Sequence, residues 1–138
     1  YFDGLTVEVY SFSYKKGLPR DLSGNGGGYV FDCRAINNPG RYSIYAYSSG
    51  LDQNVVDFLQ QDGSSETFLE PIKLLAESHV SKYLERGFSH LMFSFGCTGG
   101  QHRSVYCAHS LAGYLQSKFS NVRVIENHLQ QPYWRKKQ

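Results

Sequence analysis

A short apolar run that leads into a glycine-rich segment constrains this chain more than any other feature. Residues 91–95 read Leu-Met-Phe-Ser-Phe, the pattern of a buried strand. Residues 96–104, the glycine loop, continue as Gly-Cys-Thr-Gly-Gly-Gln-His-Arg-Ser, and an amphipathic pattern over residues 104–119 predicts a helix. This order brings unpaired backbone N–H groups to the positive end of a helix dipole. It therefore predicts a site for a phosphate or a carboxylate.

Polar side chains of the glycine loop strengthen this prediction. Arg103 carries a planar guanidinium that matches two phosphate oxygens. His102 either contacts the anion or bonds to backbone at the start of the helix. The hydroxyls of Thr98 and Ser104 either donate to a phosphate or cap the helix. The expected phosphate contacts are the backbone amides of Thr98, Gly99 and Gly100, the guanidinium of Arg103, and the hydroxyls of Thr98 and Ser104.

Cys97 and Arg103 are six positions apart, the spacing of cysteine-dependent phosphatases. In that chemistry a thiolate attacks phosphorus while the arginine holds two oxygens. Such enzymes usually have a histidine where this chain has Gly96. They also need a carboxylic acid, for which Asp32 and Asp52 are the candidates. Cys97 is therefore a small residue buried beneath a tight turn, a ligand contact or, as the alternative function, a nucleophile.

A charged pair lies on a second predicted strand, residues 29–34. Asp32 and Arg34 alternate around Cys33, so both face the same side of a strand. They either hold the sugar or amine end of a ligand or form a surface ion pair that contributes little. Strands that end at one edge of an open sheet would bring this pair to the glycine loop.

The periodicity of hydrophobic residues predicts seven elements. We expect strands over residues 5–13, 29–34, 91–95 and 121–126, and helices over residues 51–61, 67–86 and 104–119. We expect Asp52 to cap the first helix and Gly87 to end the second. This order predicts a single layered α/β domain with a mixed or mostly parallel sheet flanked by helices.

Length and composition predict one globular domain over residues 1–138. The 138 residues include 41% hydrophobic and 19% charged residues, enough to bury a core. Three cysteines without a CxxC motif favour a reducing, cytoplasmic compartment, and no segment resembles a membrane span. The histidines show no metal spacing, and no cofactor is indicated. Because the chain begins with Tyr1, we expect a domain cut from a longer protein.

Basic residues offer a weaker signal for a nucleic acid. The net charge of +2 is too small to indicate such a partner by itself. Lys and Arg near Tyr and Trp suit an RNA backbone, and a solvated surface with a frayed tail is the alternative. The candidate RNA-binding residues are Lys15, Lys16, Arg135, Lys136 and Lys137.

With these segments in view, the chain resembles the RapZ C-terminal domain family. The matching segments are residues 96–106, 11–19, 29–34, 38–39 and 50–52, so the resemblance covers nearly the whole chain. It implies an α/β fold likened to a phosphofructokinase subdomain. It also implies a regulatory domain, not an enzyme, that binds glucosamine-6-phosphate and small RNAs and delivers RNA to an endonuclease.

The resemblance implies a ligand site and several partners. Phosphate would be bound by Thr98, Gly99 and Arg103. The whole expected ligand set is Asp32, Arg34, Asn38, Cys97, Thr98, Gly99, Gly100, His102, Arg103 and Ser104. The family pattern has a sugar-site histidine shortly after the Asn-Pro turn, whereas this chain continues there with Gly40-Arg41-Tyr42. Expected partners are a phosphorylated amino sugar or another small anion, structured RNA, a nuclease or fused kinase-like domain, and further copies of the chain, with no membrane.

Overall fold

Four strands form one sheet in which every neighbouring pair is parallel. The computed structural model describes residues 2–137, and its strands are β1 (Leu5–Ser13), β2 (Tyr29–Asp32), β3 (His90–Cys97) and β4 (Val122–His128). Their order in the sheet is β2-β3-β1-β4. All four carboxyl ends therefore meet at one edge of the sheet, which confirms the predicted α/β class with a mostly parallel sheet.

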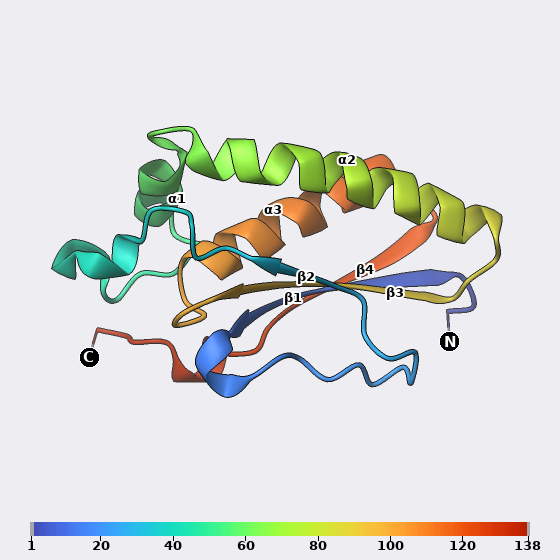
Figure 1. Ribbon diagram of the computed structural model, residues 1–138, viewed down its shortest axis with the longest axis horizontal. Helices are drawn as coiled ribbons and strands as arrows, with labels where there is room; N and C mark the ends of the chain where they lie inside the picture. The colour runs from blue at the N-terminus through green and yellow to red at the C-terminus, as the bar shows by residue number, and fades with distance from the viewer. Residues whose placement is uncertain (1, 138) are drawn as a thin grey trace.

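Three helices cover one face of this sheet. They are α1 (Gln53–Gln60), α2 (Ser64–Glu85) and α3 (Arg103–Lys118), and the segment between β1 and β2 runs along the other face (Figure 1). None of the helices in residues 2–137 is both long enough and apolar enough to cross a membrane.

The core lies between the sheet and the helices. Alternate residues of β1, from Leu5 to Val9, are fully buried against the helices, and so are Phe93 and Phe95 of β3. Tyr10 and Phe12 point to the opposite face and are buried as well. The central strands are thus covered on both faces, as parallel sheets usually are.

Most predicted boundaries differ from the observed ones by one to three residues, and two of these differences have identifiable reasons. β2 ends at Asp32, not at residue 34, because the chain turns there: the Cys33 N–H still donates to Gly96 O at 2.8 Å, and the Ile36 N–H donates back to Cys33 O. The second helix begins at Ser64, not at residue 67. The Asp62 carboxylate accepts the Ser64 N–H at 3.0 Å and so starts the helix earlier.

The two predicted helix ends are where we expected them, with one difference. Gly87 stops α2 in a left-handed conformation, with φ of 71°. Asp52 is the N-cap residue of α1, but its carboxylate accepts the Ser49 N–H at 2.7 Å instead of a helical N–H. Four short 3₁₀ helices were not expected: η1 (Tyr14–Lys16), η2 (Pro39–Arg41), η3 (Ser43–Tyr45) and η4 (Gln131–Tyr133).

Two glycines provide a matched test of the packing at the start of α3. A Cβ atom on Gly50 would lie 2.3 Å from His102 O and 2.5 Å from Tyr106 N, whereas one on Gly113 would meet nothing within 4 Å. We expect Gly50→Ala to lower the free energy of unfolding by about 1–3 kcal/mol. Gly113→Ala should raise it by about 0.5–1 kcal/mol through helix propensity. Urea unfolding measures both, and equal effects would contradict the packing described here.

Candidate functional site

The glycine loop leaves the carboxyl end of β3 and turns into α3 beside the end of β2. Gly96 has no room for a side chain, because a Cβ atom there would lie 2.4 Å from the Phe12 ring and 2.6 Å from the Tyr14 ring. Gly100 adopts φ of 71°, a conformation that glycine accepts without strain. The loop geometry therefore explains why residues 96 and 100 are glycines. The structure also brings the loop and residues 32–34 together, as expected.

Arg103 is the most informative side chain of the loop. It is only 5% exposed, and its Nη1 donates to Arg34 O at 2.8 Å and to Ile36 O at 3.1 Å. Its Nε is buried and has no acceptor among residues 2–137. The guanidinium thus holds the turn after β2 with one nitrogen and keeps a buried donor free.

The backbone amides of the loop divide into free and engaged groups. Within residues 2–137, the N–H groups of Thr98, Gly99 and Ser104 have no protein acceptor. The Gly100 N–H points to the Cys97 sulfur at 3.3 Å instead. Thr98 and Gly99 are also exposed, whereas the first residues of α3 are buried, so the open part of the loop is its first turn.

Cys97 lies beneath the loop. Its side chain is 3% exposed, and its thiol donates to Ser104 Oγ at 3.1 Å. Ser104 is itself fully buried, so its hydroxyl faces this sulfur. This geometry is that of a small residue packed under a tight turn, one of the three interpretations of the sequence.

His102 is the N-cap residue of α3, and its ring bonds to backbone. Its Nε2 lies 2.9 Å from Tyr45 O, to which it donates. Burial lowers the pKa of this imidazole, so the ring is neutral near pH 7. Of the two interpretations of His102, the structure shows the backbone contact.

Asp32 and Arg34 bind each other at the edge of the site. Arg34 Nη2 lies 2.8 Å from Asp32 Oδ2, and the guanidinium stacks 4.0 Å from the centre of the Tyr14 ring. The hydrogen bonds from Arg34 lower the pKa of Asp32. Both side chains are about half exposed, so their outer surfaces face solvent beside the loop.

Asn38 lies farther along the same edge. Its side chain accepts the Gly40 N–H at 2.9 Å and so caps η2. It also lines a cavity of about 230 Å³ together with Tyr42 and Phe58. The structure therefore places Asn38 beside a separate hollow, which the glycine loop does not line.

The C-terminal segment that braces the loop was not predicted from the sequence. Trp134 Nε1 donates to Gly100 O at 2.9 Å. The Gln101 amide accepts the Arg135 N–H at 3.0 Å and donates to Ser48 O at 3.0 Å. The one tryptophan of the chain, in an otherwise polar segment, was the available signal.

A polar network, in which His128 and Ser11 are buried and Glu126 and His109 reach the surface, holds this C-terminal segment to the sheet. Glu126 Oε2 accepts hydrogen bonds from His128 at 2.6 Å and from His109 at 2.8 Å. The other nitrogen of His128 lies 2.6 Å from Ser11 Oγ, and its ring lies 6.0 Å from that of Trp134. These contacts link β4 to the residue that braces the glycine loop.

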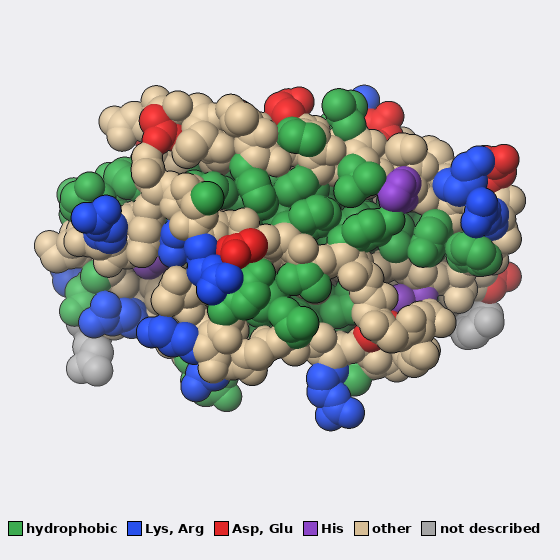
Figure 2. Space-filling model, viewed as in Figure 1, with side chains coloured by type: hydrophobic (Ala, Val, Ile, Leu, Met, Phe, Trp, Pro, Cys, Tyr) green, Lys and Arg blue, Asp and Glu red, His purple; other side chains and the backbone are tan. Residues whose placement is uncertain are grey.

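Basic side chains from both ends of the sequence gather at the same edge. Lys15 and Lys16 form part of η1, directly after Ser13, whose hydroxyl donates to Thr98 O at 2.6 Å. Residues 135–137 are exposed and follow the contact between Arg135 and Gln101. Figure 2 shows several Lys and Arg side chains toward the side on which the strands end in Figure 1.

Comparison with known proteins now identifies the family. The model of the RapZ C-terminal domain matches residues 5–131. The chain belongs to this family. The sequence resemblance is therefore confirmed, and it covers both the glycine loop and the turn after β2.

Several curated proteins are similar to this member of the RapZ C-terminal domain family. A nucleotide-binding protein of Ruegeria sp. (strain TM1040) is 39% identical over 120 residues, which are 87% of this chain and 38% of that protein. One of Endomicrobium trichonymphae is 36% identical over 87% of this chain and 40% of its own length. One of Cereibacter sphaeroides (strain ATCC 17025) is 42% identical over 78% of this chain and 34% of its own length. The chain thus spans about two fifths or less of these relatives.

The network around Glu126 makes a testable contribution to stability. Hydrogen bonds from His128 and His109 lower the pKa of Glu126 below its usual 4.5. The resulting stabilisation is present above the unfolded-state pKa and is lost as the pH falls through the lower folded-state value. We expect Glu126→Gln to be less stable than the native chain at pH 6, with a difference that shrinks below pH 4.

Urea unfolding at pH 3 to 7 measures this difference. Glu85→Gln is the matched control, because Glu85 is exposed at the end of α2 and pairs only with Lys82. A difference for Glu126→Gln that does not depend on pH would contradict the assigned role of the network.

Proposed function

We propose that this domain binds a phosphorylated amino sugar at the carboxyl edge of the sheet and acts as a sensor without chemistry of its own. The phosphate lies over the free amides of the glycine loop and accepts from Arg103. The observation that carries this proposal is the buried Arg103 Nε without an acceptor within residues 2–137.

A buried charged donor without a partner is costly, so an acceptor from outside the chain is expected at this position. Phosphate oxygens are strong acceptors for a guanidinium. Nη1 already holds the carbonyls of Arg34 and Ile36, so the group is fixed before the ligand arrives. A fixed donor loses little entropy on binding, which favours affinity.

Asp32 is the residue that would contact the amino group of the ligand. Its lowered pKa keeps the carboxylate ionised at neutral pH, beside the turn that Arg103 holds. An ionised carboxylate suits an ammonium group and sugar hydroxyls. Glucosamine-6-phosphate, which the family resemblance implies, carries both the phosphate and the amine.

The relatives are named nucleotide-binding proteins, and phosphate is the chemistry that a nucleotide shares with a sugar phosphate. Adenosine monophosphate is therefore the competing ligand to test. A nuclease, a kinase-like domain and further copies of the chain remain partners predicted from the resemblance.

The ligand and the role of Arg103 are tested together by calorimetric titration with glucosamine-6-phosphate. Arg103→Ala should weaken binding by about 30-fold or more, since it removes a charge-assisted contact of about 2–5 kcal/mol. Thr98→Ala, at an exposed position, should weaken it by about two- to tenfold without disturbing the fold. Arg86→Ala at the far end of α2 is the matched control and should change nothing.

Three outcomes would overturn this assignment. Unchanged affinity in both Arg103→Ala and Thr98→Ala would show that the glycine loop is not part of the binding site. Equal binding of glucosamine without its phosphate would show that the anion does not contribute to binding. Release of inorganic phosphate during the titration, abolished by Cys97→Ser, would instead support the cysteine-dependent phosphatase.

We propose RNA binding as a second function, favoured by the basic side chains that gather beside the loop. Lys15, Lys16 and residues 135–137 supply these charges from two separate segments. Because each phosphate contact releases counterions, binding should weaken steeply with salt. We expect Lys136→Ala with Lys137→Ala to reduce the slope of log affinity against log salt by about 1–2.

Fluorescence anisotropy of a structured RNA at several salt concentrations measures this slope. A double variant with Lys73→Ala and Lys82→Ala on α2 is the control, because it removes the same charge from another surface. Undetectable binding at low salt, or the same slope in all three proteins, would contradict the RNA function and leave the sugar-phosphate proposal intact.

A further inference from the structure

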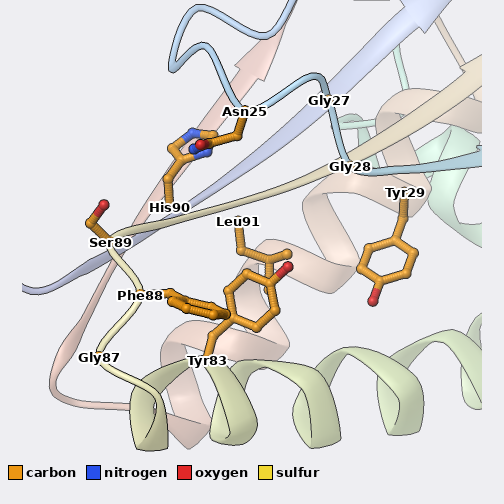
Figure 3. A pocket seen from close by; sticks show the side chains of 10 residues that line it. All are labelled: Asn25, Gly27, Gly28, Tyr29, Tyr83, Gly87, Phe88, Ser89, His90 and Leu91. Carbon is orange, nitrogen blue, oxygen red and sulfur yellow. The ribbon is translucent and has the colours of Figure 1, made fainter.

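A second cavity lies at the opposite edge of the sheet, where β2 and β3 begin. Its volume is about 580 Å³, within the range of small-molecule sites. Figure 3 shows its two kinds of lining: the rings of Tyr29, Tyr83 and Phe88 near Leu91, and the polar side chains around His90. Neither the glycine loop nor any residue of the proposed phosphate site lines it.

The rim of this cavity has a defined structure. The Asp21 carboxylate accepts the N–H groups of Ser23 at 2.9 Å and Gly27 at 2.8 Å. These bonds, above all the one from the Ser23 hydroxyl, lower the pKa of Asp21 to about 2. Gly28 packs directly on the next strand, where a Cβ atom would lie 2.1 Å from Met92 O. The loop that forms the rim is therefore held in one place on the sheet.

Aromatic rings form the apolar wall. Tyr83 and Phe88 meet edge to face with their centres 5.0 Å apart. Phe88 is still 46% exposed, so part of its ring is uncovered. The Tyr29 ring stacks 5.0 Å from Phe93, and its hydroxyl bonds to His79. Tyr83 and Phe88 are nearly perpendicular, so the uncovered part of Phe88 is the flat apolar surface that another ring can stack on.

The polar side offers hydrogen bonds to the edge of such a ring. His90 Nε2 lies 2.5 Å from Glu8 Oε2, which orients the imidazole. The other ring nitrogen, Nδ1, has no partner within residues 2–137 and accepts a hydrogen bond in the neutral ring. Asn25 lies over His90 in Figure 3, and Ser89 lies beside it. Donors and acceptors thus stand next to an aromatic wall.

The charges around the cavity disfavour an anion. No Lys or Arg is among its lining residues. The carboxyl end of α2, which carries the negative end of the helix dipole, lies at this edge. Glu8 and Asp21 add two carboxylates nearby, of which Glu8 is bonded to His90. Lys82 and Arg86 lie at the same end of α2 but do not line the cavity, so a phosphate inside it would find no cation among the lining residues.

We propose that this cavity binds an uncharged, nitrogen-containing aromatic ring with the chemistry of a purine base in a nucleoside. The ring stacks on Phe88, which Tyr83 holds in place by its edge-to-face contact. Its amino and ring-nitrogen groups bond to His90, Asn25 and Ser89. The volume accommodates a base with its ribose, and the absence of cations from the lining separates a nucleoside from a nucleotide.

Nuclear magnetic resonance of the ¹⁵N-labelled chain tests this site with adenosine, ribose and adenosine monophosphate. Adenosine should shift the amide signals of residues 87–91, ribose should not, and adenosine monophosphate should bind these residues more weakly than adenosine. Phe88→Ala should weaken adenosine binding by about tenfold through loss of stacking. Leu74→Ala is the matched control, because Leu74 is 66% exposed on α2 outside the cavity.

Ser89→Ala provides a second variant that leaves the aromatic packing intact, and it should weaken adenosine binding by about two- to tenfold. The proposal is overturned if adenosine leaves residues 87–91 unshifted, or if Phe88→Ala and Ser89→Ala both bind it as the native chain does. Tighter binding of the monophosphate at residues 87–91 also overturns it. None of these outcomes affects the glycine loop, so the two sites are judged separately.

Discussion

A buried guanidinium joins the two segments on which the candidate site depends. Arg103 starts α3, yet its Nη1 holds the carbonyls of Arg34 and Ile36 in the turn after β2. A buried charge must be bonded, so this contact fixes the glycine loop against the neighbouring strand end. The position of the Asp32–Arg34 pair follows from the same bond. Arg103 is thus both a structural residue and a candidate ligand-binding residue, because Nη1 bonds to the turn while Nε has no acceptor within residues 2–137.

The loop is also held from the side that faces away from β2. Gln101 bonds to residues of two separate segments, and Trp134 donates to Gly100 O. Gly50 lies against the first turn of α3 without room for a methyl group. A loop fixed by so many contacts does not need to be ordered by a ligand, which favours binding. The same contacts place the basic C-terminal residues beside it.

Features that depend on neighbouring residues, such as the strand, the glycine loop and the helix, could be predicted from the sequence. Most contacts between segments far apart in the sequence could not. The strand, glycine loop and helix were recognisable because their signals are adjacent, and the order of the strands and helices pointed to a mixed or mostly parallel sheet. The end of β2 was misplaced because the apolar pattern continues through Cys33 while the chain already turns there. The brace formed by Gln101 and Arg135 joins residues 34 positions apart, and no local pattern marks it. The roles of Cys97 and Ser104 depended on their facing each other, which spacing alone does not determine.

The parallel sheet gives the molecule two chemically different edges. At the carboxyl edge, the positive end of α3 meets the guanidinium of Arg103 and exposed lysines, so anions are favoured there. At the amino edge, the negative end of α2 meets the carboxylates of Glu8 and Asp21. Because all four strands run the same way, a helix that follows a strand begins at the carboxyl edge, and a helix that precedes a strand ends at the amino edge. This difference agrees with the two proposals, a phosphate at the carboxyl edge and a ring without one at the amino edge.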